Sequence, residues 1–169
     1  MATFTYYFIV GQTTNEEFKE MLDSSKAPMV ELEIPGSIIF TIPVSTVNKV
    51  ITDMALLADT WYECMEAIHW LIGYRFDKPE RFATDVEIGM GVAHSGYPMM
   101  AQPLQTKNWD LQYLTTNGVW GFFHEIGHNI VKRRFVPRGA VEVVNNLIPQ
   151  MVNSKVTLKN DSIPNIIQL

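Results

Sequence analysis

The stretch NGVWGFFHEIGHNIVKRRFVPRGAVEVVNN, residues 117–146, predicts a helix, a loop and a second helix. Apolar residues recur at helical spacing over 117–133, and a second such pattern begins near Gly139. We expect the second helix to kink or end at Pro149, because proline lacks a backbone N–H and its ring clashes with the preceding turn. The intervening loop lets the second helix return beside the first.

The first of these helices carries the pattern His-Glu-x-x-His over residues 124–128. Histidines four residues apart place both imidazoles on one side of a helix, where one cation can bridge them. Glu125 follows the first histidine and can act on the attacking water as a general base without binding the metal itself. The alternative is that both histidines merely pack or cap within a buried helix, which suits a lone histidine better than this pair. We predict His124 and His128 as ligands of Zn2+ and Glu125 as the base.

A catalytic zinc ion commonly has three protein ligands and an open fourth position, so a third ligand is needed. No histidine follows His128, and the next acidic residue is Glu142, fourteen positions later in the second helix. The alternative is a solvated glutamate that stabilises the N-terminus of that helix. Its apolar neighbours Val141 and Val143 argue against full exposure, and we predict Glu142 as the third ligand.

Three asparagines lie close in sequence to the predicted ligands. Asn129 follows the second histidine, and Asn145 and Asn146 lie three and four residues after Glu142. Their amides could brace the ligands or bind a substrate backbone. Asparagines at a helix surface or helix end are an equally good alternative.

The N-terminal part of the chain predicts a small β-sheet. Residues 3–10 are β-branched and aromatic, and 29–43 predict two short strands around the turn pair Pro35-Gly36. Together with the helices that follow, these strands indicate the α+β class.

Between and after these strands the sequence predicts further helices. Residues 14–23 predict a short helix, and 45–74 predict one long helix with a 3.6-residue apolar period. Residues 82–93 predict another strand, and the glycine- and proline-rich stretch 94–103 predicts a loop.

Composition predicts one globular domain over residues 1–169. The chain is 47% hydrophobic and 18% charged, which favours a folded core over disorder. Its net charge is −5, and its only basic cluster, residues 132–134, is too short to follow a phosphate backbone. We therefore expect no nucleic-acid partner.

The sequence gives little information about the compartment. No basic residue precedes the apolar run near the N-terminus, so no signal peptide is predicted, and no stretch reaches the roughly 18 apolar residues of a transmembrane helix. The single cysteine, Cys64, cannot form an internal disulfide. The compartment stays unknown from the sequence: the protein is either cytoplasmic or secreted as part of a longer parent of which this chain is a fragment.

Four segments together resemble one family, the enhancin-type and mucin-degrading zinc metallopeptidases of the gluzincin group. Residues 120–129 (WGFFHEIGHN) resemble its zinc helix, and residues 140–146 (AVEVVNN) resemble its third-ligand helix. Residues 80–98 are similar to the family's strand and loop that end in HSGYP, and residues 27–43 are similar to the strands that open its catalytic region. The resemblance covers about residues 27–150 in the family's order.

The resemblance implies a zinc endopeptidase that acts on proteins, O-glycosylated mucin-like ones among them, with the ligands and base named above. It also implies a zincin-like α+β catalytic region whose later helical part is largely missing from this chain. Members often have histidine and glutamine where this chain has Ile130 and Val131. The alternative is a noncatalytic domain that binds a protein or glycan, as in vertebrate channel-associated factors, which have lost zinc-site residues that this chain keeps.

Several other polar residues are candidates with simpler alternatives. Tyr97, or His94, could donate a hydrogen bond to the oxyanion of the transition state, and the alternative for both is a packed turn. Asp85 could orient a ligand imidazole but fits a surface position better. His69 and Cys64 are predicted to be packed and inert.

Overall fold

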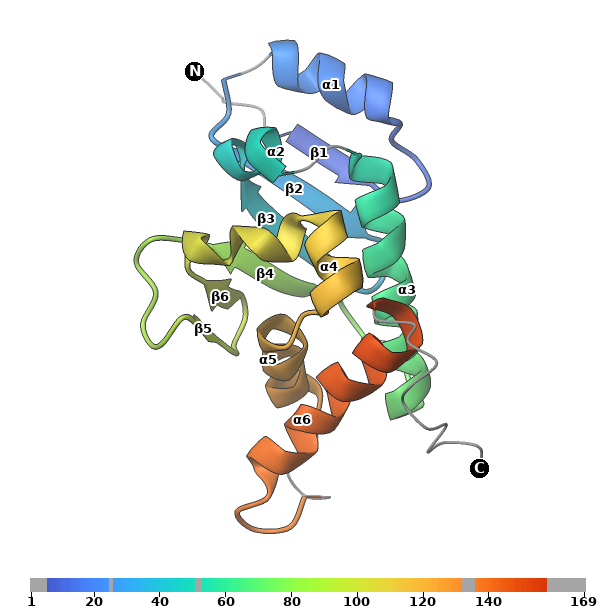
Figure 1. Ribbon diagram of the computed structural model, residues 1–169, viewed down its shortest axis with the longest axis vertical. Coiled ribbons are helices and arrows are strands. Elements are labelled where there is room, and N and C mark those ends of the chain that lie inside the picture. Colours follow the sequence, from blue (N-terminus) through green and yellow to red (C-terminus); the bar gives the residue numbers. More distant parts are fainter. Residues whose placement is uncertain (1–5, 25, 51–52, 132–135, 158–169) are drawn as a thin grey trace.

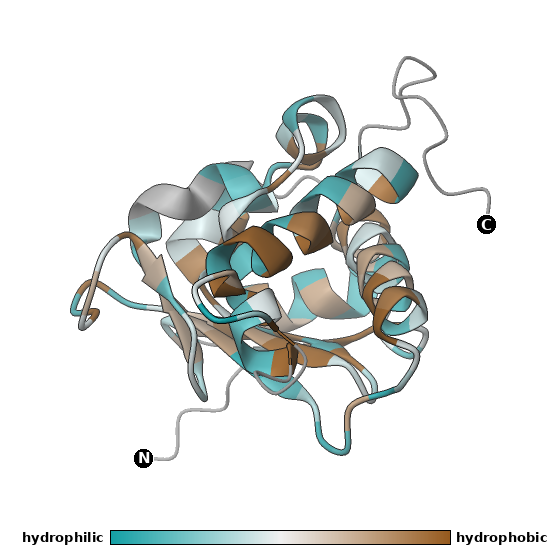
Figure 2. Cartoon of the chain, turned by 90° about the horizontal axis from the view of Figure 1, so that it is seen from below, coloured by the Kyte–Doolittle hydropathy of each residue, from teal (hydrophilic) through white to brown (hydrophobic). Residues whose placement is uncertain are grey.

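The computed structural model describes residues 6–24, 26–50, 53–131 and 136–157. Within these residues, six strands form one mixed sheet in the order β1-β2-β3-β4-β6-β5, and helices cover one of its faces (Figure 1). Seen from below, apolar residues gather between the helical layer and the strands (Figure 2). The α+β class predicted from the sequence is confirmed.

The first three strands lie within the segments predicted from the sequence. β1 (Tyr6–Ile9) runs parallel to β2 (Met29–Ile34), which forms an antiparallel hairpin with β3 (Ile38–Pro43). Gly36 makes the turn with φ of +71°, a backbone conformation that glycine adopts without steric cost. The two strands predicted around Pro35-Gly36 are therefore confirmed, and residues 3–5 of the first predicted strand lie outside the described part.

The second face of the sheet carries several polar side chains and, among the described residues, no layer of helices (Figure 1). Alternate residues of β2 and β3 are only half-buried, and Arg81 donates to Glu31 at 2.6 Å across this face. Tyr7 donates to Glu33, and burial together with this carboxylate raises the pKa of Tyr7 to about 12. The described helices, with the candidate site residues on α5 (Gly121–Ile130) and α6 (Val141–Val152), therefore lie on the opposite face of the sheet.

The sheet extends further along the chain than the small N-terminal sheet that we predicted. The strand predicted over 82–93 is confined to β4 (Glu80–Thr84), and β5 (Ala93–His94) and β6 (Met99–Ala101) lie in and beside the predicted loop. Their short length and the glycines and prolines around them hide the strand pattern. β5 and β6 add an antiparallel pair to the edge of the sheet.

The long helix predicted over 45–74 is two helices, α2 (Val44–Val50) and α3 (Met54–Ile72). Asp53 begins the second helix, because its carboxylate accepts a hydrogen bond from the backbone N–H of Leu56 at 3.0 Å. That contact also lowers the pKa of Asp53. The apolar period continues across the break, which is why the sequence alone suggested one helix. The short helix α1 (Asn15–Ser24) matches its prediction.

The predicted helix–loop–helix is present with different ends. α5 (Gly121–Ile130) is shorter than the predicted 117–133, because residue 117 ends a separate helix, α4 (Leu111–Asn117), and residues 132–133 lie outside the described part. An unpredicted 3-10 segment, η1 (Pro103–Trp109), precedes α4.

α6 (Val141–Val152) does not end at Pro149 but continues into the π-helical segment η3 (Asn153–Thr157). Pro149 itself, Ile148 before it and Met151 after it are buried, so packing holds the helix past the proline.

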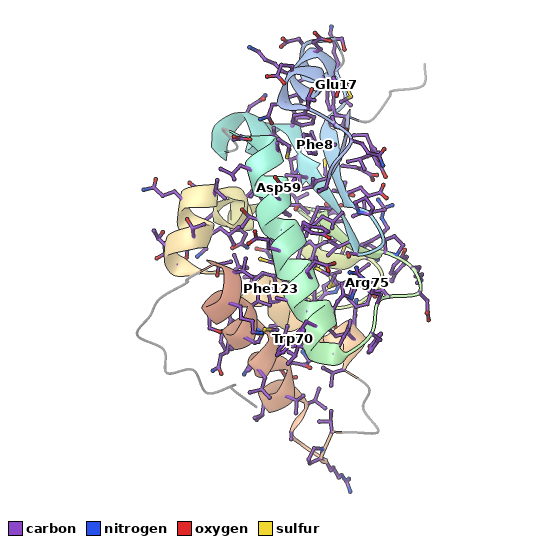
Figure 3. The ribbon with its side chains drawn as sticks, turned by 90° about the vertical axis from the view of Figure 1, so that its right-hand side faces the viewer. Phe8, Glu17, Asp59, Trp70, Arg75 and Phe123 are labelled. Atoms are coloured by element: carbon purple, nitrogen blue, oxygen red, sulfur yellow. The ribbon has the colours of Figure 1, made fainter. Side chains whose placement is uncertain are left out.

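An aromatic cluster anchors α5 to the sheet. The ring of Phe122 lies 4.0 Å from that of Phe82 on β4, and the ring of Phe123 lies 5.2 Å from that of Trp61 on α3, between centroids. Figure 3 looks onto α3, with Phe123 beside it. Because these two residues face the core, the His124 and His128 side of α5 faces away from it.

Two remaining expectations concern the whole fold. Cys64 is buried in α3, and burial raises the pKa of its thiol, in accord with an inert core residue. Among the helices of the described residues, none has both the length and the apolar character needed to cross a bilayer.

Candidate metal centre

The two histidines of α5 meet on its polar side. His124 and His128 lie one turn apart, their side chains are 15% and 22% exposed, and their Nε2 atoms are 3.1 Å from each other. Two nitrogens that face each other at this distance leave room for one small cation bound to both.

A close approach of α5 and α6 brings the third side chain to this pair. A Cβ atom at Gly127 would lie 3.2 Å from Cβ and 3.3 Å from Cα of Asn145, and 3.1 Å from Cδ1 of Ile148. A larger residue at 127 would push the two helices apart. The glycine between the two histidines therefore sets the spacing on which the site depends, a role that sequence reasoning missed and that a glycine inside a helical pattern can signal.

Glu142, in the first turn of α6, points its carboxylate at both imidazoles. Its Oε2 atom lies 3.0 Å from Nε2 of His124 and 3.5 Å from Nε2 of His128, although its side chain is 67% exposed. The apolar neighbours that argued against exposure do not bury it, because Val143 is itself exposed. The predicted grouping of the three residues is nevertheless the observed one.

The three facing atoms fit a tetrahedral zinc ion. Ligand atoms at the usual zinc–nitrogen and zinc–oxygen distances of about 2.0–2.1 Å, at tetrahedral angles, lie roughly 3.3 Å from one another. The observed distances between the three donor atoms, 3.0, 3.1 and 3.5 Å, lie on both sides of that value. Two imidazoles and one carboxylate are also a donor set that zinc accepts, so His124, His128 and Glu142 fit the ion.

Two asparagines of α6 hold the far sides of the imidazole rings. Nδ1 of His124 lies 2.6 Å from Oδ1 of Asn146, which can only accept, so Nδ1 carries the proton and Nε2 is free to bind a metal. Nδ1 of His128 lies 2.7 Å from Nδ2 of Asn145. Of the two readings that the sequence left open, these contacts favour bracing of the ligands.

Glu125 is half-buried on α5, beside His124. Among the described residues, no hydrogen bond or ion pair engages its carboxylate. Such a carboxylate is free to accept a proton from a water molecule.

Asn129 ties the HSGYP segment to α5. Its amide accepts from the backbone N–H of Gly96 at 3.0 Å and donates to the Gly96 carbonyl at 2.8 Å and to Glu80 at 2.7 Å. The amide thus fixes residues 94–98 beside α5, and it serves as a clamp for a loop and not as a brace for a ligand.

The structure places the two oxyanion candidates in this clamped segment. The Tyr97 hydroxyl donates to the Pro79 carbonyl at 3.2 Å, and Nζ of Lys78 lies 3.6 Å from the centroid of its ring. Nδ1 of His94 lies 2.8 Å from the carbonyl oxygen of Ser95.

Two other polar residues have the simpler roles that the sequence favoured for them. Asp85 is exposed and accepts a hydrogen bond from the backbone N–H of Glu87, while the imidazole-orienting position is taken by Asn146. His69 is 6% exposed and packed, with its Nε2 3.0 Å from the Ser37 hydroxyl.

The sequence matches one family model and several known proteins. The family model described as "Peptidase M60, enhancin and enhancin-like" matches residues 2–166. The chain is 40% identical over 127 residues to the TRPM8 channel-associated factor 3 of Rattus norvegicus, an alignment that covers 73% of this chain but only 14% of that protein.

Two solved structures share the fold. A functionally unknown conserved protein from Bacillus anthracis superposes with a TM-score of 0.75 at 22% identity, over 86% of this chain and 33% of that one. The metallopeptidase IMPa from Pseudomonas aeruginosa, solved with an O-glycopeptide, superposes with a TM-score of 0.62 at 17% identity, over 88% of this chain and 20% of that one.

Proposed function

The chain belongs to the M60 family of enhancin and enhancin-like peptidases, and we propose that it is a zinc-dependent endopeptidase with His124, His128 and Glu142 as metal ligands. One observation carries this proposal. Three donor atoms from two helices face one point at separations of 3.0, 3.1 and 3.5 Å, as the ligands of one tetrahedral ion do.

The proposed reaction is hydrolysis of a peptide bond without a covalent enzyme intermediate. When bound, zinc supplies Lewis-acid chemistry, which lowers the pKa of water and polarises a substrate carbonyl. Glu125 accepts a proton from the attacking water as the new carbon–oxygen bond forms, and it then gives that proton to the leaving amine as the carbon–nitrogen bond breaks. Its position next to His124, free of other partners among the described residues, suits both transfers.

We propose proteins as the substrates, with O-glycosylated mucin-like chains among them. The fold that this chain shares with IMPa, which was solved with an O-glycopeptide, supports this class. No nucleic-acid substrate is proposed, because the net charge of −5 opposes binding to a polyanion.

The proposed function is tested by measuring zinc content and cleavage together. We expect about one zinc ion per chain and cleavage of an O-glycosylated mucin-like protein, detected as new termini by mass spectrometry. A zinc chelator should abolish cleavage, and added zinc should restore it. The same substrate stripped of its glycans shows whether the glycan is needed. Absence of bound zinc at saturating zinc would contradict the proposal.

A noncatalytic binding domain is the second candidate. The observation that favours it is the 40% identity to a protein named as a channel-associated factor. Such a domain would bind zinc without cleaving any of these substrates, and a fourth protein ligand would close the coordination shell. A zinc-bound structure distinguishes the two, because a catalytic site keeps its fourth position open.

Tyr97 is our proposed donor to the oxyanion. Its hydroxyl would leave the Pro79 carbonyl when substrate binds, while the Asn129 clamp holds the segment in place. We expect Tyr97→Phe to lower kcat on the order of 10²-fold with little change in KM, because this contact would form only in the transition state. Steady-state kinetics on a peptide substrate measure both constants.

The phenylalanine variant is a matched replacement. It keeps the ring that lies under Lys78 and removes only the hydroxyl. An unchanged kcat would limit Tyr97 to its bond with the Pro79 carbonyl and would exclude it from catalysis.

A further inference from the structure

Asn129 has three hydrogen bonds that together fix which way its amide faces. Its Oδ1 accepts from the backbone N–H of Gly96 at 3.0 Å, and its Nδ2 donates to the Gly96 carbonyl at 2.8 Å and to Oε2 of Glu80 at 2.7 Å. The N–H needs an acceptor, and the carbonyl and the carboxylate need donors, so the reversed amide would lose all three bonds. Glu80 and Gly96 therefore set the orientation of the amide together.

Glu80 is a firm anchor for this amide because its backbone belongs to the sheet. It is the first residue of β4, and its N–H donates to the Ser37 carbonyl at 2.9 Å. The two residues before it hold Tyr97, whose hydroxyl donates to the Pro79 carbonyl and whose ring lies under Nζ of Lys78. The start of β4 and the residues before it therefore hold the clamped segment at two successive positions.

The clamped segment lies on the same side of α5 as the proposed base. Glu125 and Asn129 are four residues apart in this helix, so their side chains lie one above the other on one face, with Cβ atoms roughly 5–6 Å apart. Gly96 contacts the Asn129 amide through both its N–H and its carbonyl. The segment that carries Tyr97 is therefore on the side of the helix where Glu125 would meet the attacking water.

We propose that Glu80 and Asn129 form a positioning pair, which sets residues 95–97 against the Glu125 side of α5 so that the Tyr97 hydroxyl reaches the reacting carbonyl. The inference rests on the proposed peptidase function and adds two residues to it. Neither residue belongs to the group whose donor atoms converge, and each acts through the segment that it holds. A misplacement of about 1 Å in such a segment can cost on the order of 10²-fold in rate.

Exchanging the donor and the acceptor of the pair tests the proposal on the whole chain. Asn129→Asp has nearly the same shape, but its carboxylate would face the Glu80 carboxylate and could donate neither to it nor to the Gly96 carbonyl. We expect kcat to fall on the order of 10²-fold with little change in KM. Adding Glu80→Gln puts a donor opposite the new carboxylate and should recover about tenfold of that loss.

Zinc content and a second substitution show through what the pair acts. Zinc should stay at one ion per chain in every variant, because neither residue contacts the imidazoles. Tyr97→Phe should cost less in the Asn129→Asp background than in the unaltered chain, since the hydroxyl is already misplaced there. Asn48→Asp, at an exposed position on α2, is the matched control and should change none of these quantities.

Hydrogen exchange at Gly96 measures the hold without any substrate. Gly96 is exposed, and its N–H is engaged by the Asn129 amide. We expect Asn129→Ala to speed exchange of this N–H by about tenfold or more, while the amides of the central strand β2 keep their rates and show that the variant is folded. Equal exchange at Gly96 in both chains would show that other contacts hold the segment, and the inference would fail.

The outcomes separate this inference from the proposed function. If the unaltered chain cleaves no substrate, the proposed function fails and the inference fails with it. If the chain is active and Asn129→Asp keeps its kcat, only the inference fails. The same holds if Glu80→Gln restores nothing to Asn129→Asp, or if the losses from Asn129→Asp and Tyr97→Phe simply add.

Discussion

Glu125→Gln is expected to slow peptide cleavage by orders of magnitude while zinc content stays at one ion per chain. The amide cannot accept the proton of the attacking water, so kcat should fall by about 10²–10⁴-fold, the usual contribution of a positioned general base. Zinc should remain, because Glu125 is not among the three residues whose donor atoms converge. Cleavage rates at saturating substrate and metal analysis of the same preparation give both numbers.

Glu20→Gln is the matched control, since it removes one exposed carboxylate from α1, far along the chain from the site. It should change neither quantity. Full activity in the Glu125 variant would refute its assignment as the base. Loss of zinc in that variant would instead show that the carboxylate supports the metal.

The sequence predicts the local structure well where a hydrophobic period continues over many residues or where proline and glycine mark a turn. The β2–β3 hairpin follows from two short strand-like segments on either side of the turn pair Pro35-Gly36. The division of α2 from α3 could not be predicted, because the apolar period runs through Asp53 and only a specific contact of its carboxylate with Leu56 marks the new helix. Strands of two or three residues, such as β5 and β6, are too short to show a period at all.

The candidate site could be predicted from the sequence only in part. The i, i+4 spacing fixes how His124 and His128 face, and the search for a third ligand found Glu142, whose position beside them the structure bears out. The role of each side chain as a zinc ligand stays a prediction. A glycine within a helical pattern can signal close packing, but the partners of Gly127 and the contacts of the Asn145 and Asn146 amides with the imidazoles depend on how two helices cross.

His128→Ala is expected to remove both zinc and cleavage. With one imidazole gone, two donor atoms remain, too few for a catalytic zinc ion to be held at micromolar zinc. Thermal unfolding with and without zinc is the sensitive measurement, because a ligand at 100 times its Kd stabilises the folded state by about 2.7 kcal/mol. For a chain of this size that corresponds to a rise in Tm of roughly 5–10 °C.

The pattern across variants then identifies the role of each residue. Zinc should raise the Tm of the unaltered chain and of Glu125→Gln but not that of His128→Ala, while the metal-free Tm values show whether each variant is folded. Glu142→Gln should keep part of the shift, because its amide oxygen can still face His124 without the negative charge that draws the cation. A full zinc-induced shift in His128→Ala would mean that the ion binds elsewhere, and the three-residue centre on α5 and α6 would not be the metal site.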